Sequence, residues 1–243
     1  MGHAYLPRGA RCVVQWCFPE GGRGGVAGTC SPIGNIRIET RYPVKSSKAL
    51  KEWASTCQSY LEGEPLLLLR KGGVGDAGLE RPDGLFWLVP TWLHQQEQGL
   101  RPEALGLLER SPGLKSPPGS LHLSLAAQLY AGWEVTDPSV LPALEPHHAM
   151  TPETVLKRFN YRQSGLNAWL LRVWQTQSPV SMLWNPAWDG CVSWMNLDVA
   201  VEAPPGTNPV ADESKLDAMY HRLAALLGTP QVGPSAACGV ELP

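Results

Sequence analysis

The strongest constraint on the fold is an alternating segment near the middle of the chain. From Leu121 to Val135 every second residue is apolar, and polar residues such as His122 and Gln128 lie between them. A period of two places the apolar side chains on one face of a β-strand. The pattern predicts a long strand of an antiparallel sheet with one covered face, and its length implies a bend, for which Gly132 is the candidate.

Other apolar runs predict further strands. Leu66–Arg70, Leu85–Val89 and Leu166–Trp174 are short and bounded by turn residues, and Cys191–Leu197 predicts one more strand. The glycine-rich loop between the first two runs permits them to pair as an antiparallel hairpin. Pro90 is expected to end the second of these strands.

Helical spacing of apolar residues predicts helices between these strands. The first is expected to start at the serine pair 46–47 and to run to Leu61, and a second covers Pro102–Arg110. Thr151 and Asp212 stand at N-cap positions of two later amphipathic segments. The sequence therefore predicts an α+β fold, in which a mostly antiparallel sheet that can curl into a barrel is flanked by helices.

The order of these elements is loosely similar to that of the PUA/ASCH class of nucleotide-binding barrels. The similarity rests on a helix, a strand that ends in Arg70, and a later strand that is followed by Asp137 and Pro138. It concerns the pattern of elements alone.

The chain divides into three predicted parts. Residues 1–43 are rich in glycine and proline and basic, which predicts a disordered arm, or an upstream extension from a misassigned start. Residues 44–198 form the predicted α+β domain. Residues 199–243 contain a proline- and glycine-rich linker and an amphipathic helix.

Charge and hydropathy restrict the partners. The formal net charge is -2, from 20 basic and 22 acidic side chains, so the chain lacks the overall basic character of many nucleic-acid-binding proteins. Local patches can still differ from the total. No apolar run approaches the ~20 residues that span a bilayer, and no signal-peptide pattern begins the chain. We expect a soluble, cytoplasmic protein without a membrane partner.

The spacing of the metal-ligating residue types predicts no metal site and no cofactor. The six cysteines match neither a CxxC pair nor a zinc ribbon. His94, His147 and Glu52 offer a conceivable ligand set, but no HExxH-type motif supports it. Adjacent histidines in a proline-bounded turn, such as His147 and His148, are usually surface groups.

Six short segments, in the same order and at similar spacing, resemble one known family. They are ALKEWA at Ala49–Ala54, LRKGG at Leu69–Gly73, PTxxHQ at Pro90–Gln95, RFxY within Val155–Tyr161, LRV at Leu171–Val173 and GCxSW at Gly190–Trp194. On these residues the chain resembles the bacterial domain-of-unknown-function family 1802 over roughly residues 46–198. The loop after Gly73 departs from the family, which often carries a longer, glutamate-bearing stretch there.

The resemblance implies a biological context for the chain, but the family has no assigned activity. Family members are sometimes joined to a restriction-endonuclease-like domain, which implies a role near DNA. We therefore expect a non-catalytic nucleic-acid-binding or specificity module linked to restriction-type systems. The candidate contact residues for nucleic acid or phosphate are Arg70, Lys71, Arg158, Tyr161 and Arg172. Loop tryptophans would suit base stacking, although packing beneath loops is the commoner role of such residues.

Two alternatives stay open at this point. A small enzyme acting on a nucleotide-like substrate would use Glu52, Lys71, Thr91 and His94, which would have to converge in one pocket. The sequence leans against an enzyme, because it holds neither a P-loop nor a Ser-His-Asp elbow. An adaptor would bind a protein partner through the C-terminal helix, and deleting residues 203–243 would then leave the core folded.

Overall fold

The computed structural model describes residues 45–71, 84–92, 99–190 and 193–234. Its strands are β1 (Lys45–Trp53), β2 (Leu68–Arg70), β3 (Leu85–Thr91), β4 (Ser120–Val135), β5 (Leu166–Leu183), β6 (Trp194–Glu202) and β7 (Asn208–Pro209). Its α-helices are α1 (Ala54–Leu61), α2 (Pro102–Arg110), α3 (Leu141–Leu144), α4 (Pro152–Asn160) and α5 (Glu213–Leu227). Short 3₁₀ helices are η1 (Ser111–Leu114), η2 (Pro138–Val140), η3 (Glu145–His147) and η4 (Pro186–Trp188).

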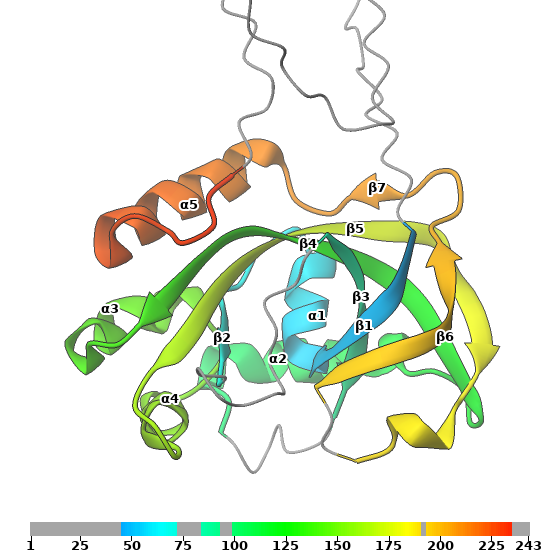
Figure 1. Ribbon diagram of the computed structural model, residues 1–243, viewed down its shortest axis with the longest axis horizontal. Coiled ribbons are helices and arrows are strands. Elements are labelled where there is room, and N and C mark those ends of the chain that lie inside the picture. Colours follow the sequence, from blue (N-terminus) through cyan, green and yellow to red (C-terminus); the bar gives the residue numbers. More distant parts are fainter. Residues whose placement is uncertain (1–44, 72–83, 93–98, 191–192, 235–243) are drawn as a thin grey trace, which may run out of the picture. The chain divides into compact units, whose positions relative to one another are not determined.

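The strands form one seven-stranded sheet with the order β2-β5-β4-β3-β1-β6, and β7 pairs with β5. β1 and β3 run parallel, and the other pairs are antiparallel. Figure 1 shows α5 lying over β4 and β5, with α3 and α4 beside the ends of these strands near β2. The predicted α+β fold, with a mostly antiparallel sheet flanked by helices, is confirmed. No helix within the described ranges is long and apolar enough to cross a membrane.

The alternating segment is a strand, as predicted. β4 pairs with β5 along its length, and the register shifts between Leu123 and Leu125 and again between Leu129 and Ala131. The second shift lies next to Gly132, where the bend was expected. Residues on both faces of the middle of β4 are buried, because helices and other strands cover both sides there.

The predicted first helix is wrong in its first half. Residues 45–53 form β1, and only Ala54–Leu61 are helical. Ala49 and Leu50 are both fully buried although they point to opposite faces, since each belongs to a different apolar cluster. A strand buried on both faces loses its alternation, so its apolar residues fitted helical spacing by chance.

The predicted hairpin is also wrong. β2 pairs with Asn167–Trp169 of β5, and β3 pairs with β1 and β4. Pro90 does not end β3, which runs to Thr91. The actual partner of β2 lies nearly 100 residues further along the chain, and local turn residues carry no information about such a pairing.

The sheet is curled and open. β2 and β6 are the two ends of the strand order, and no ladder joins them in the described chain. Three strands separate β2 from β1 in that order, yet Arg70 of β2 bonds to Glu52 of β1 at 2.6 Å. The sheet therefore curls until side chains bridge its two sides, and it does not close into the barrel that the sequence allowed.

Candidate functional site

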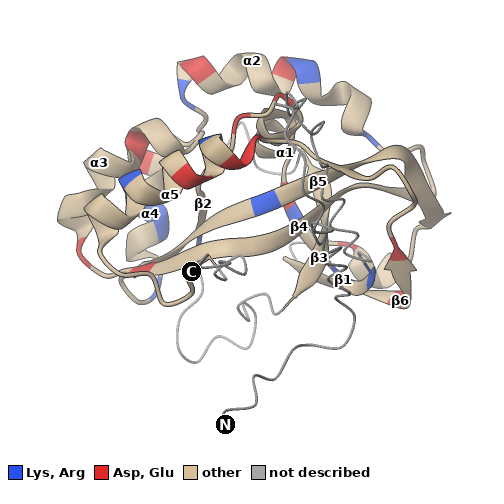
Figure 2. Cartoon of the chain, turned by 90° about the horizontal axis from the view of Figure 1, so that it is seen from above, with Lys and Arg blue, Asp and Glu red and all other residues tan. Residues whose placement is uncertain are grey.

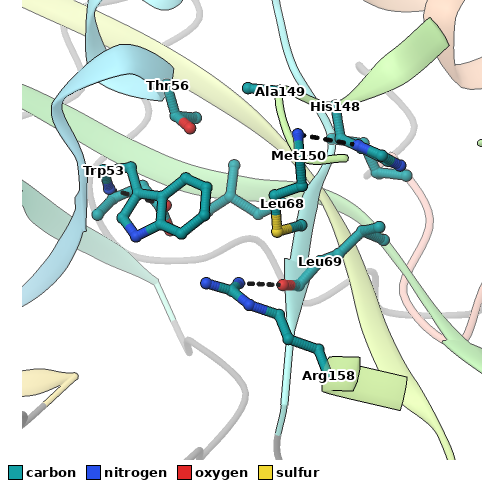
Figure 3. Close-up of a pocket in the computed structure, with 10 residues that line it drawn as sticks. Trp53, Thr56, Leu68, Leu69, His148, Ala149, Met150 and Arg158 are labelled. Atoms are coloured by element: carbon teal, nitrogen blue, oxygen red, sulfur yellow. Dashed lines mark hydrogen bonds between the residues drawn. The ribbon is translucent and has the colours of Figure 1, made fainter. Parts of the chain in front are cut away.

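A small pocket opens where the curled sheet brings β1 and β2 together. It is lined by the end of β1, the start of α1, the approach to β2, the segment that precedes α4, and α4 itself (Figure 3). The lining residues are Glu52, Trp53, Thr56, Leu67, Leu68, Leu69, His148, Ala149, Met150 and Arg158. Leucines form one wall, and the polar groups come from elements far apart in the sequence.

Backbone hydrogen bonds fix the walls of this pocket. Leu67 donates its N–H to the carbonyl of His147 at 2.6 Å, which ties the approach to β2 to η3. Arg101 donates its N–H to the carbonyl of Ala149 at 2.9 Å, which ties the start of α2 to the same wall. These hydrogen bonds hold the walls of the pocket around a free volume of about 10 Å³, roughly that of one water.

Glu52, which lines the pocket, forms an ion pair with Arg70. Arg70 Nη1 donates to Glu52 Oε2 at 2.6 Å and to the carbonyl of Lys51 at 3.2 Å, and Glu52 Oε1 accepts the N–H of Trp53 at 2.8 Å. The side chains of Arg70 and Glu52 are 12% and 9% exposed. Both oxygens of a nearly buried carboxylate are thus satisfied, as burial of a charge requires.

A second guanidinium stands beside this pair. Arg158 reaches in from the last turn of α4, lies over the Trp53 ring at 4.7 Å from its centroid, and donates to the carbonyl of Leu69 at 3.1 Å. Figure 3 shows its guanidinium pointing toward Trp53. Burial lowers the pKa of Arg158 to about 10, with Glu52 opposing the shift and Arg70 adding to it. Two cations and one carboxylate therefore share this place.

His148 supplies a neutral polar group to the wall. Its side chain is 2% exposed, and its Nδ1 accepts the N–H of Met150 at 3.2 Å (Figure 3). Burial, followed by the charge of Arg101, lowers the pKa of His148 to about 4. The ring is therefore uncharged near pH 7, with its proton on Nε2.

We expect the buried histidine to make the fold sensitive to mild acid. The native state excludes a proton that unfolded His148 binds, so stability is full above the unfolded pKa of about 6.5 and falls as the pH approaches about 4. The loss from this group is about 2 kcal/mol by pH 5. Urea unfolding between pH 7.5 and 4.5 measures it. His148→Asn should flatten the profile, His221→Asn on α5 should not, and equal profiles for the two variants would contradict the assignment.

The structure brings three of the sequence-predicted residues together, namely Glu52, Arg70 and Arg158. Lys71 lies close by but is held by backbone. Its Nζ donates to the carbonyls of Phe159 and Gly165, at 2.9 Å each, and to that of Gln163. Burial lowers the pKa of Lys71. Its ammonium thus caps the end of α4 and the following turn.

The other predicted residues lie elsewhere. Tyr161 is 57% exposed just after α4, with the Arg162 guanidinium 5.2 Å from its ring centroid. Arg172 lies under α5, where it pairs with Glu213 at 2.7 Å and lies over the ring of Tyr130. Thr91 is the last residue of β3 and pairs with Trp53 of β1, the residue that follows Glu52. His94 lies outside the described residues, as do Gly72, Gly73 and residues 1–43.

The loop tryptophans pack against the protein. Trp188 is 3% exposed and donates its Nε1–H to the carbonyl of Asn196 at 2.9 Å. Trp184 donates to Asp189 at 2.9 Å and meets Trp188 edge to face, and Trp92 donates to Ser111 at 3.1 Å. These contacts give the three indoles structural partners, which is the commoner role noted above.

Sequence reasoning missed three residues of the pocket, Trp53, Thr56 and His148. Trp53 and Thr56 fell within a predicted helix, and His148 was expected at the surface. Their one local signal is the position of Trp53 within the ALKEWA segment, directly after Glu52. Across the residues that the structure describes, no three His, Cys, Asp or Glu side chains are grouped so that they could hold a metal ion.

The fold and the site define a small α+β domain in which a nearly buried ion pair and a second guanidinium lie at a small pocket. A family model described as "Domain of unknown function (DUF1802)" matches residues 49–222, and the chain belongs to that family. The match extends beyond the expected end at Asp198 and includes the first part of α5. Among curated proteins no significant match is found.

Solved structures give only distant similarity. A crystal structure of the ASCH protein from Zymomonas mobilis is 13% identical, with a TM-score of 0.35, and the alignment covers 75% of this chain and 96% of that one. A point mutant of the same protein is 12% identical, with a TM-score of 0.36, over 62% of this chain and 88% of that one. Similarity at this level carries no function to this chain.

Proposed function

We propose that the guanidiniums beside the pocket bind a phosphate of a nucleic acid and that the chain acts as a non-catalytic nucleic-acid-binding or specificity module. One observation carries the proposal: two guanidiniums, Arg70 and Arg158, come together beside the Glu52 carboxylate at a small pocket. Two guanidiniums gathered at a poorly hydrated place favour an anion that bonds to both. An incoming anion adds negative charge beside both guanidiniums.

Guanidinium chemistry favours phosphate as that anion. A guanidinium presents planar paired donors that match phosphate oxygens, and such charge-assisted hydrogen bonds are among the strongest in proteins. Trp53 and the Leu69 carbonyl hold Arg158 in one orientation before any ligand arrives. Preorganisation of this kind reduces the entropic cost of binding.

Surface charge restricts the side from which a polyanion approaches. Figure 2 shows acidic residues on α5, on α2 and just after α1, and basic residues on α4. The acidic groups include Glu62, Glu64, Glu103, Glu109 and Glu213. Repulsion from that face directs a strand to the side of α4 and η3. The restriction-type associations of the family make DNA a polymer to test beside RNA.

The test is binding of the full chain to single- and double-stranded DNA and RNA, followed by fluorescence anisotropy from ~50 mM salt upward. For Arg158→Gln we expect affinity to fall about 10- to 100-fold, since a charged hydrogen bond contributes about 1.5–3 kcal/mol. The salt slope should fall by about 0.7 for each lost contact to a single strand. Arg158→Lys keeps the positive charge but loses the paired planar donors of the guanidinium. Its affinity should lie between that of Arg158→Gln and that of the unmodified chain.

Arg110→Gln is the matched control, because it removes one guanidinium from an exposed pair with Glu62 at the far end of α2. Its affinity should equal that of the unmodified chain. Thermal unfolding of each variant separates lost binding from lost folding. Absence of binding to all four polymers at ~50 mM salt, or equal affinity for Arg158→Gln and Arg110→Gln, would sink the proposal.

A further inference from the structure

The turn that follows α4 carries an exposed aromatic ring. Tyr161, the residue at the C-cap of α4, is 57% exposed, and its N–H donates to the carbonyl of Arg158 at 3.2 Å. Residues three apart on a helix have Cβ atoms about 5–6 Å apart. Tyr161 therefore lies outside the pocket but within one helical turn of Arg158, close enough for neighbouring nucleotides of one strand to contact both.

Hydrogen bonds and a cation fix the conformation of this turn. Lys71 Nζ donates to the carbonyls of Phe159 and Gly165 at 2.9 Å each, and the Gly165 N–H donates to the Phe159 carbonyl at 3.0 Å. Arg162 has a φ of 59°, which is uncommon for residues other than glycine. Its guanidinium lies over the Tyr161 ring at 5.2 Å from the centroid. Arg162 thus occupies one face of an oriented ring, and a ligand can stack on the other.

The charges around this ring are positive. Arg158 and Arg162 flank Tyr161 in the sequence, and Lys71 binds the same turn. Residues 154–165 include no acidic side chain. An exposed aromatic ring among cations suits a nucleotide whose base is unpaired, because the base stacks on the ring while the cations attract its phosphates. A base inside a duplex is stacked between its neighbours and cannot make this contact.

We propose that Tyr161 stacks one unpaired base of the strand whose phosphate Arg158 binds, so that the ligand is a single-stranded nucleic acid. This inference rests on the proposed function, since Arg158 is taken to hold the phosphate. Every base has a π-face, so stacking on an aromatic side chain tolerates any sequence. Tyr161 therefore selects single strands over duplexes without selecting a sequence.

Three ligands of equal length test this inference by fluorescence anisotropy with the full chain: a single strand of about ten nucleotides, its duplex, and an abasic strand that keeps the phosphates without the bases. For Tyr161→Ala we expect affinity for the single strand to fall about tenfold or more. The salt slope should not change, because no charge is lost. Affinities for the duplex and the abasic strand should stay as they are. Tyr161→Phe keeps the ring and should bind like the unmodified chain.

Leu156→Ala is the matched control, because Leu156 is 49% exposed on the same helix and has no π-face. It should leave all three affinities unchanged, and melting temperatures of the variants check their folding. If none of the three ligands binds, the proposed function itself fails. If Arg158→Gln weakens binding but Tyr161→Ala does not, only the stacking role is overturned. An equal loss for the single strand and the abasic strand in Tyr161→Ala would overturn it as well.

Discussion

Glu52→Gln is expected to lower the free energy of unfolding by about 3–5 kcal/mol. The substitution keeps an oxygen that can accept the Trp53 N–H, but it removes the counter-charge of Arg70 and Arg158. Two guanidiniums that are largely out of water then repel each other without the negative charge of Glu52 beside them. Breaking a buried ion pair by removing one partner is costly for this reason.

Urea unfolding at pH 7.5 measures this loss, and inorganic phosphate tests its cause. We expect phosphate to raise the unfolding midpoint of Glu52→Gln more than that of the unmodified chain, because a ligand that binds only the native state stabilises it by mass action. Glu62→Gln is the control, since it breaks an exposed pair with Arg110 and should cost less than about 1 kcal/mol. Equal losses of unfolding free energy in Glu52→Gln and Glu62→Gln would show that solvent screens the Glu52–Arg70 pair as it screens the exposed one.

Local patterns predicted the elements whose determinants are local. Burial alternates over Ser120–Leu125 at the start of β4, as the apolar period of two predicts. Thr151 and Asp212 cap α4 and α5 as expected, accepting the N–H groups of Thr154 and Ser214. Capping and periodicity act over a few residues, so the sequence alone carries them.

Pairing between distant segments could not be predicted in the same way. β1 was mistaken for a helix because burial on both faces hides its alternation. β2 was assigned to β3 because a hairpin is the simplest partner, whereas it pairs with β5. Each of these choices depends on which strands are adjacent in the completed sheet, and that is a property of the whole fold.

The sequence predicted individual residues of the site, but it did not predict that they lie together. Glu52, Arg70 and Arg158 were all named, but Glu52 was assigned to catalysis and the two arginines to binding. Their convergence depends on the curl that brings β2 back to β1. His148 was expected at the surface, because its burial depends on packing by α2 and β2 and no local signal reports that packing.

Deletion of residues 211–243 is expected to abolish cooperative unfolding of the remaining chain. Leu216, Met219 and Leu223 of α5 are 3%, 7% and 0% exposed, and they belong to the same apolar cluster as Trp133 of β4. Removing α5 would expose that cluster to water, with the loss of several fully buried side chains. The family match, which reaches residue 222, agrees with a helix that belongs to the domain.

Point substitutions on α5 make this expectation quantitative. Leu223→Ala should cost about 2–5 kcal/mol, because it leaves a cavity in the core. Leu226→Ala, three residues further along the same helix and 39% exposed, should cost less than about 1 kcal/mol. Urea unfolding at 25 °C compares the two. A truncated chain that keeps its unfolding midpoint, with equal effects of the two substitutions, would show that α5 contributes nothing to the core. Its apolar face would then be available to a protein partner, as the adaptor alternative requires.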